Sequence, residues 1–171
     1  MLDAPLPTLN SARLRLRSPD ERDRAALLAG LQTADLPNWF EAIQPPIDDA
    51  LVDRMLAGDG AVERWLIEDK EHRAFQGMVA LHLATGSGDY VSYWLVDAAR
   101  GQGYASEAVS ALLDHALIER RMSALLSTVH DGNEASHALM RRLNFDLVRP
   151  CQLKDRTGSL YRMTQRAWRR R

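Results

Sequence analysis

The chain has 171 residues, of which 46% are hydrophobic and 26% are charged, and these values are typical of globular proteins. Its 22 basic and 23 acidic residues give a formal net charge of -1, without the positive excess of proteins that bind nucleic acids or anionic membranes. The composition thus excludes disordered, fibrous and disulfide-rich classes, and it favours a small-molecule or peptide partner.

The length predicts one domain spanning residues 1–171, since no repeat, linker or low-complexity tract divides the chain. Cys151 is the only cysteine, so a disulfide cannot form within the chain and a multi-cysteine metal site is impossible. The start of the chain lacks the apolar segment of a signal peptide, and no stretch approaches the length of a membrane span. We therefore expect a cytoplasmic protein without a membrane anchor.

The N-terminal part of the chain predicts a strand and two helices. Residues 13–17 alternate between polar and apolar side chains, as a strand with one solvated face does, and a helical run follows over residues 18–31. Prolines interrupt residues 36–60, where we expect loops and a short helix over residues 51–56. The pair Asp48-Asp49 at its start suits helix capping better than acid–base chemistry.

The rest of the chain predicts an antiparallel meander followed by alternating helices and strands. Polar turns separate three extended runs, at residues 61–68, 74–84 and 89–96. The strongest helical signal follows, a row of apolar residues at helical spacing from Ala105 to Leu117. After it we expect a buried strand, a helix capped by Asn133 and two final strands, over residues 124–129, 135–143, 145–148 and 160–164.

A glycine-rich turn, Arg100-Gly101-Gln102-Gly103-Tyr104-Ala105-Ser106, connects the meander to the strongest helix. Unpaired backbone N–H groups and the positive end of the helix dipole make a helix N-terminus an anion site, and glycines let a phosphate approach closely. An ordinary strand-to-helix turn is an equally good explanation of two glycines.

Two of three phosphate-binding patterns fail at this turn. A Walker A loop needs Gly-Lys-Ser/Thr, which is missing. A dinucleotide fingerprint needs a third glycine where Ser106 stands, and the acid after the next strand, Asp131, comes about five positions late. The pattern Arg/Gln-x-x-Gly-x-Gly/Ala is met in full by Arg100, Gly103 and Ala105.

With four further motifs, this turn makes the chain resemble the GNAT superfamily of acetyl-CoA-dependent N-acetyltransferases, and within it the branch that acetylates the N-termini of ribosomal proteins. The further motifs are Ala12-Arg13-Leu14-Arg15-Leu16-Arg17, Tyr93-Trp94-Leu95, Tyr104-Ala105-Ser106-Glu107-Ala108, and Asn133-x-x-Ser136 followed by Leu143-Asn144-Phe145. The likeness covers residues 11–168. It implies the GNAT fold: a mixed, mostly antiparallel α/β sheet of six to seven strands with about four helices and a splay between strands four and five.

The resemblance implies acetyl-CoA as cosubstrate, and no metal. The backbone N–H groups of residues 102–106 would hold the pyrophosphate, and Arg100 would add charge or order the turn. The end of strand four would pair with the pantetheine arm, and a backbone N–H near Val96 would polarise the thioester carbonyl. The cofactor contacts implied in this way are Trp94, Leu95, Val96, Arg100, Gly101, Gln102, Gly103, Tyr104, Ala105, Ser106 and Asn133.

The same resemblance makes Ser136 a hydrogen-bond donor near the sulfur, which is the catalytic role in this prediction. Core packing explains the side chains of Trp94 and Leu95 equally well, and helix capping alone explains Asn133. His130 and His137 lie seven positions apart without a supporting motif, so we expect no metal site.

Three departures from the family pattern leave part of the chemistry open. Met140 stands where many members have a proton-donating tyrosine, and since a thioether cannot donate, Ser136 is the remaining acid. Tyr90 replaces a glutamate that could act as base, and His82 or ordered water are the candidates for that role. Asn144 replaces a glycine, and we expect it to keep the turn because asparagine tolerates the left-handed conformation.

We therefore expect an N-acetyltransferase in which a neutral primary amine attacks the thioester directly, without an acyl-enzyme. The acceptor is a protein N-terminal α-amine or a small amine, and an α-amine is the easier to deprotonate, with a pKa of about 7.7–8.0 against about 10.4 for lysine. The first helix, residues 36–60 and the 155–158 turn would surround the acceptor. A non-catalytic acyl-CoA sensor of the same fold is the alternative, and the protein is expected as a monomer or homodimer without nucleic-acid or membrane partners.

Overall fold

The computed structural model describes residues 6–32, 35–58, 60–83, 88–154 and 156–171. Its strands are β1 (Leu9–Asn10), β2 (Leu14–Arg17), β3 (Val62–Asp69), β4 (Phe75–His82), β5 (Tyr90–Leu95), β6 (Ala124–His130), β7 (Asp146–Leu153) and β8 (Arg156–Thr164). Its helices are η1 (Glu21–Asp23), α1 (Arg24–Leu31), α2 (Leu36–Trp39), α3 (Asp49–Ala57), η2 (Asp97–Ala99), α4 (Tyr104–Leu113), η3 (Asp114–Glu119), α5 (Glu134–Arg142) and α6 (Gln165–Trp168).

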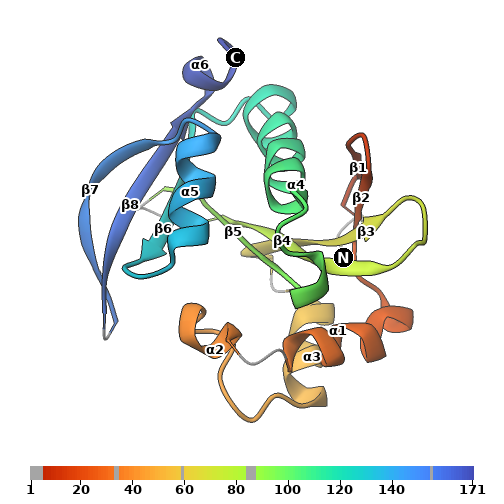
Figure 1. Ribbon diagram of the computed structural model, residues 1–171. Coiled ribbons are helices and arrows are strands. Elements are labelled where there is room, and N and C mark those ends of the chain that lie inside the picture. The colour runs from red at the N-terminus through yellow and green to blue at the C-terminus, as the bar shows by residue number, and fades with distance from the viewer. Residues whose placement is uncertain (1–5, 33–34, 59, 84–87, 155) are drawn as a thin grey trace.

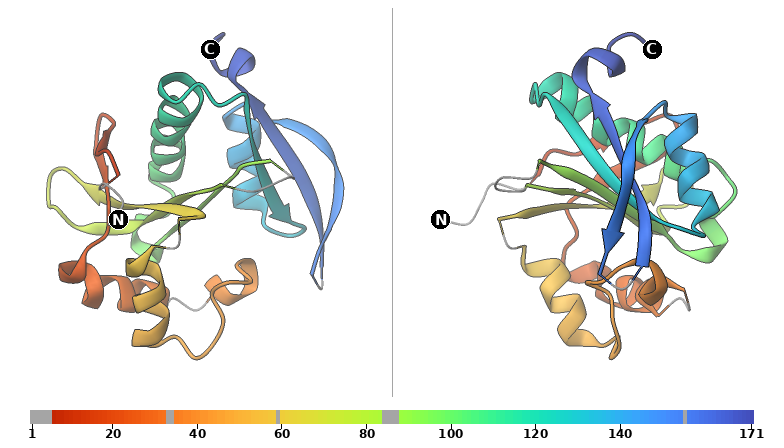
Figure 2. Two further views of the ribbon diagram at one scale, coloured as in Figure 1. Left: turned by 180° about the vertical axis from the view of Figure 1, so that it is seen from behind. Right: turned by 90° about the vertical axis from the view of Figure 1, so that its left-hand side faces the viewer.

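The strands form one sheet between two layers of helices. Its order is β1-β2-β3-β4-β5-β6-β8-β7, and every neighbouring pair is antiparallel except β5 and β6. Helices α4 and α5 lie on one face, and α1, α2 and α3 lie on the other (Figures 1 and 2). Alternate residues of β4 serve the two cores: Val79 and Leu81 pack with α4, and Met78 packs with α1 and α3.

The expected mixed, mostly antiparallel fold is confirmed, with eight strands and six α-helices instead of six to seven strands and about four helices. The additional short elements include β1, α2 and α6, whose lengths of 2, 4 and 4 residues are too small for a periodic pattern to emerge. Strands β7 and β8 also begin or end well beyond their expected limits. β7 is an almost fully exposed edge strand, so it lacks the alternation that marks a half-buried strand.

Strands β5 and β6 separate soon after they meet, which confirms the expected splay. Only Tyr90 and Leu126 are paired between them, and the Leu126 N–H donates to the Asp89 carbonyl oxygen at 2.8 Å. Beyond this point the two parallel strands diverge.

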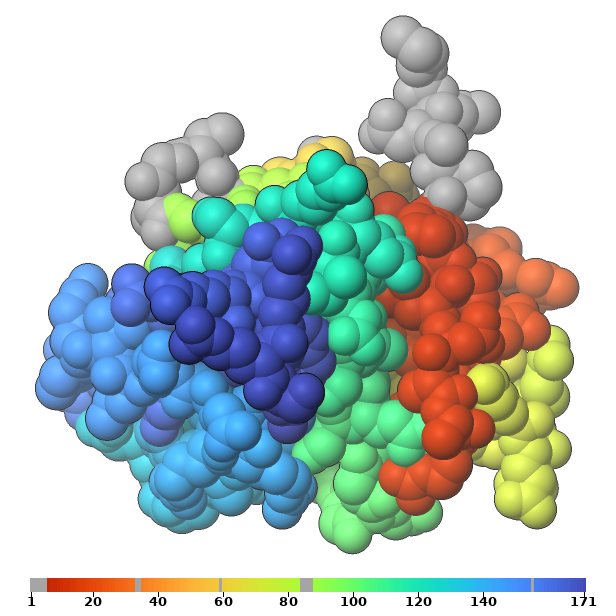
Figure 3. All heavy atoms as spheres, turned by 90° about the horizontal axis from the view of Figure 1, so that it is seen from above, coloured from red at the N-terminus to blue at the C-terminus, as the bar shows by residue number. Residues whose placement is uncertain are grey.

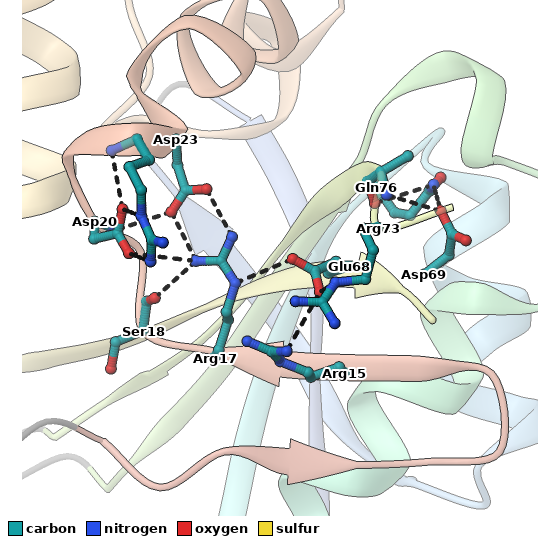
Figure 4. Close-up of polar contacts among 11 residues, drawn as sticks. Arg15, Arg17, Ser18, Asp20, Asp23, Glu68, Asp69, Arg73 and Gln76 are labelled. Atoms are coloured by element: carbon teal, nitrogen blue, oxygen red, sulfur yellow. Dashed lines mark hydrogen bonds and ion pairs between the residues drawn. The ribbon is translucent and has the colours of Figure 1, made fainter. Parts of the chain in front are cut away.

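An arginine-centred cluster joins β2 to β3 and η1 (Figure 4). Arg17 donates to both carboxylate oxygens of Asp23, at 2.8 and 2.7 Å, and to Glu68 at 3.2 Å. Arg73 and Arg15 also approach Glu68, at 2.9 and 3.8 Å. The polar face of β2, expected to be solvated, is thus partly covered by ion pairs that hold the start of the first helical segment against the sheet.

None of the helices among the described residues has both the length and the apolar character needed to cross a membrane.

Candidate active site

The glycine-rich turn runs from η2 into α4 and leaves the first turn of that helix open. Gly101 and Gly103 have φ values of 73° and 81°, in the left-handed region that favours glycine. Gly103 is the N-cap of α4 and has no side chain with which to cap it, so the first N–H groups of the helix remain for another acceptor. The arrangement is that of an anion site built from backbone.

Two arginines hold this turn in place from outside. Arg100 makes a bidentate ion pair with Asp35: its two terminal guanidinium nitrogens donate to the two carboxylate oxygens at 2.9 and 2.8 Å. This hydrogen bonding lowers the pKa of the Asp35 carboxyl. Arg13 donates to the Gln102 carbonyl oxygen at 3.0 Å, and its guanidinium lies 4.7 Å from the centre of the Tyr104 ring. Of the two roles expected for Arg100, its contacts are those of a residue that orders the turn.

Glu107, in the first turn of α4, fixes the N-terminal segment beside the turn. It accepts hydrogen bonds from the Ser11 hydroxyl at 2.7 Å and from Arg13 Nε at 2.8 Å. Burial alone would raise the pKa of Glu107, but the hydrogen bonds from Ser11 and Arg13 outweigh it and lower the pKa. The space-filling view shows the N-terminal segment lying along α4 (Figure 3). Glu107 thus joins the opening arginine motif to the first turn of α4.

A cavity of about 580 Å³ lies between the turn, the end of β5 and the start of α5. The residues expected to contact a cofactor that line this cavity are Trp94, Leu95, Arg100, Gly101, Gly103, Tyr104, Ala105, Ser106 and Asn133. Ser136 lines it as well, together with Arg142, whose guanidinium donates to the Ser106 hydroxyl at 3.2 Å. The positive charge of Arg142 therefore lies beside the open helix terminus. Arg142 belongs to none of the sequence motifs.

Two expected cofactor residues lie outside this lining. The prediction for Val96 needs correction: its N–H donates to the Gln76 carbonyl oxygen at 3.0 Å, and its side chain packs between the two cores. The Gln102 side chain turns back and donates to the Ala98 carbonyl oxygen at 2.7 Å. The Trp94 side chain packs against Phe75, with 5.7 Å between the ring centres, in the core that contains Leu27 and Leu51.

The hydrogen-bond ladder identifies which backbone groups of β5 face the gap instead. Because the Val96 N–H points to β4, and N–H directions alternate along an antiparallel strand, the Trp94 N–H also points to β4. The N–H groups of Tyr93 and Leu95 then point the other way, towards the gap between β5 and β6. Leu95, rather than Val96, thus presents a backbone donor at the end of the cavity.

A second cavity, of about 410 Å³, lies across the gap on the α2 side of the sheet. Its lining includes His82 and Ser92, whose Nε2 and hydroxyl oxygen are 2.7 Å apart, and Tyr90. His130, at the end of β6, also lines it, and its Nδ1 is buried without a hydrogen-bond partner among the described residues. The residues common to both cavities are Trp39, Phe40, Tyr93, Asn133 and Ser136.

Asn133 and Ser136 stand where the two cavities meet. The Asn133 side-chain oxygen caps α5 by accepting from the Ser136 N–H at 3.2 Å, so the capping role is present whatever else the amide contacts. The Ser136 hydroxyl is adjacent to the Tyr93 hydroxyl. Burial raises the pKa of Tyr93 to about 12, although hydrogen bonding with Ser136 acts to lower it. Met140 is fully buried in the core, so it faces neither cavity.

The remaining expected residues have structural surroundings. Asp48 caps α3 by accepting from the Leu51 N–H at 3.1 Å, and Asn144 has a φ of 59°, so it keeps the left-handed turn expected of it. His137 bonds to the Tyr161 hydroxyl at 2.8 Å, away from His130. Among the described residues, no three His, Cys, Asp or Glu side chains gather as metal ligands. The expected 155–158 turn includes residue 155, which is outside the described residues.

The sequence matches the family described as acetyltransferase (GNAT) domain over residues 13–146. It is 26% identical, over 91% of this chain and 87% of the relative, to the uncharacterized protein YkkB of Bacillus subtilis. Its fold is similar to that of RimL, a ribosomal L7/L12 α-N-protein acetyltransferase in complex with coenzyme A, with a TM-score of 0.84, 21% identity and coverage of 94% and 99% of the two chains. Mycobacterium smegmatis RimJ in complex with CoA-disulfide gives a TM-score of 0.77, 20% identity and coverage of 95% and 88%.

Proposed function

The chain belongs to the GNAT family of acetyltransferases, and we propose that it transfers the acetyl group of acetyl-CoA to a protein N-terminal α-amine. The observation that carries this proposal is the meeting of two cavities at Ser136 and Tyr93, across the gap between β5 and β6. One cavity ends at an anion site, and the other opens on the opposite face of the sheet. Two substrates can thus approach one point from opposite sides.

The cavity beside α4 suits coenzyme A on the chemistry of its walls. The open N–H groups at the start of α4 and the nearby Arg142 guanidinium match a pyrophosphate, since both favour negative charge. The free backbone edge of Tyr93 and Leu95 matches the amides of the pantetheine arm, which would add to β5 like a further strand. The similar structure of RimL is a complex with coenzyme A, and that of RimJ is a complex with CoA-disulfide.

In the proposed reaction, the amine nitrogen attacks the thioester carbonyl carbon and forms the C–N bond. The carbonyl oxygen gains negative charge, and the Leu95 N–H is the backbone donor in place to stabilise it. The C–S bond then breaks with its electron pair on sulfur, next to the Ser136 hydroxyl. A thiol of pKa about 8.5 leaves readily as thiolate, so Met140 in place of a tyrosine does not prevent the reaction.

The acceptor must lose a proton in the cavity on the α2 side. His82 and His130 both line that cavity, and either imidazole or a water molecule between them can take the proton. An α-amine needs the smallest push because its pKa is about 7.7–8.0. The name of RimL describes α-N-acetylation of a ribosomal protein, which supports the same class of acceptor here. The lone cysteine suits a cytoplasmic enzyme of this kind.

The test combines calorimetric titration with acetyl-CoA and an assay of thiol release against peptides with free N-termini. Matched peptides with a blocked N-terminus and one lysine, and small polyamines, complete the panel. Binding with thiol release for the free N-termini alone supports the proposal. Binding without release from any amine would favour the acyl-CoA sensor. Release only with lysine or polyamines would show that the acceptor is a side-chain or small-molecule amine instead of an α-amine. The absence of any binding would remove the function altogether.

A further inference from the structure

The hydroxyl groups of Tyr93 and Ser136 are neighbours at the junction of the two cavities. Tyr93 comes from β5 and Ser136 from the first turn of α5, and both line both cavities. The Tyr93 hydroxyl oxygen is buried, yet no hydrogen bond of standard geometry reaches it from the described residues. Ser136 is the hydrogen-bonding neighbour of this hydroxyl, and a small rotation of either hydroxyl would let the phenol donate to the Ser136 oxygen.

Tyr93 differs from the other three tyrosines in the cavities it lines and in its hydroxyl neighbour. The Tyr161 hydroxyl bonds to His137, and Tyr104 lies under the Arg13 guanidinium at the edge of the cofactor cavity. Tyr90 lines only the cavity on the α2 side and not the cavity beside α4. Among the four, Tyr93 alone lines both cavities and has Ser136 as its neighbour.

At neutral pH the Tyr93 hydroxyl acts as a hydrogen-bond donor. Burial raises the pKa of Tyr93 to about 12, so the phenol keeps its proton under working conditions. A serine oxygen accepts a hydrogen bond through its lone pairs while its one hydrogen points elsewhere. When the phenol donates to the Ser136 oxygen, the Ser136 hydrogen is left for a group in the cofactor cavity.

We propose that Tyr93 is a positioning residue that donates to the Ser136 oxygen and thereby directs the Ser136 hydrogen at the sulfur of the bound thioester. The inference rests on the proposed acetyl transfer. As the C–S bond breaks, its electron pair moves to sulfur, which accepts the Ser136 hydrogen bond, while the proton released by the amine passes to an imidazole or to water in the cavity on the α2 side. No proton leaves Tyr93, and the thiolate takes up its proton from solvent. Hydroxyls in a chain polarise one another, so the pair stabilises a developing thiolate better than Ser136 alone.

The variants that test this inference are Tyr93→Phe, Ser136→Ala, Ser136→Thr and the double combinations, with Tyr161→Phe as the control for loss of a phenol elsewhere. We expect Tyr93→Phe to lower single-turnover acetyl transfer about tenfold, with acetyl-CoA affinity within about twofold of wild type, as loss of one transition-state hydrogen bond does. In the Ser136→Ala background the same change should cost less than about twofold, and in the Ser136→Thr background the full effect should return.

Other results overturn the inference. An unchanged rate for Tyr93→Phe shows that the phenol does nothing in the reaction, and a tenfold loss that persists in Ser136→Ala shows that it acts without Ser136. A parallel loss of affinity and rate, together with a lower melting temperature, assigns Tyr93 to packing. If the wild-type protein releases no thiol with any amine, the proposed function falls and this inference falls with it. An active wild-type enzyme with an insensitive Tyr93 removes only the inference.

Discussion

Gly77 in β4 controls how closely β5 lies beside it, and its replacement by alanine should damage both stability and cofactor binding. Gly77 has a φ of 146°, and a Cβ there would lie 2.1 Å from the Trp94 carbonyl oxygen and 2.8 Å from the Leu95 Cα. Both contacts are with backbone, which cannot swing aside as a flexible side chain can. Strand β5 must therefore move away from β4, and it moves at Trp94 and Leu95, the end that lies beside the gap.

The magnitude follows from two separate costs. An alanine held in a sparsely populated backbone conformation costs about 1–3 kcal/mol, and overpacking adds about 1–3 kcal/mol. Together these give a total of about 2–6 kcal/mol for Gly77→Ala. For a chain of this size, 1 kcal/mol shifts the melting temperature by about 2–4 °C, so the melting temperature should fall by about 4–24 °C.

Gly58 provides a matched control. It also has a positive φ, of 65°, but a Cβ there would meet nothing within 4 Å. With φ 65° and ψ 151° Gly58 is in a region that is essentially restricted to glycine, so Gly58→Ala should cost only this backbone strain, about 1–3 kcal/mol. Thermal unfolding followed by circular dichroism, and calorimetric titration with acetyl-CoA, separate the two variants. Equal melting temperatures and unchanged acetyl-CoA affinity in both would refute the argument that contact with Trp94 and Leu95 matters.

Three further predictions concern the turn, the arginine cluster and acid stability. Gly103→Val should lower acetyl-CoA affinity at least about tenfold in calorimetry while costing about 1–2 kcal/mol of stability, because φ is strained at an exposed site; unaffected affinity would contradict the anion site. Arg17→Met should cost about 3–5 kcal/mol in denaturant unfolding, since it leaves Asp23 and Glu68 without their shared partner, and a loss below about 1 kcal/mol would show that the cluster is dispensable. Burial would raise the pKa of Asp23, but Arg17 and the Asp20 N–H lower it overall, and Arg100 lowers the pKa of Asp35. The stability that these two carboxylates contribute is therefore present above about pH 4 and is lost as pH falls through their folded-state pKa values. A melting temperature that stays level from pH 6 to about pH 3 would exclude this linkage.

The turn and the strong helix were accessible from the sequence because their signals are local. Gly101, Gly103 and the apolar row of α4 lie within one short stretch, and the positive φ values of both glycines are what that spacing predicts. Asn133 and Ser136 likewise lie one helical turn apart, so a local motif brings them together. Such features need no knowledge of the tertiary fold.

The contacts that support the turn were not accessible, because they join distant parts of the chain. Arg100 and Asp35 are 65 positions apart, and Arg13 and Glu107 are 94 apart. Strand β7 was underestimated for a different reason: its exposed face gives no alternation, and Pro150 within it is typical of an edge strand. The sequence placed the donor only near Val96, since only the ladder with β4 determines which N–H groups face the gap.

One short segment of β5 serves both requirements of the proposed reaction. Alternation in the ladder turns the N–H groups of Tyr93 and Leu95 towards the gap, whereas alternation of side chains places the Tyr93 ring on the α5 face, next to Ser136. A shift of β5 by one residue would reverse both at once. The close approach of Gly77 to Trp94 and Leu95 helps fix that register, so backbone donor and hydroxyl pair are positioned by the same packing. In the proposed reaction, Tyr93 on the sheet and Ser136 on α5 together take the place of a tyrosine at position 140.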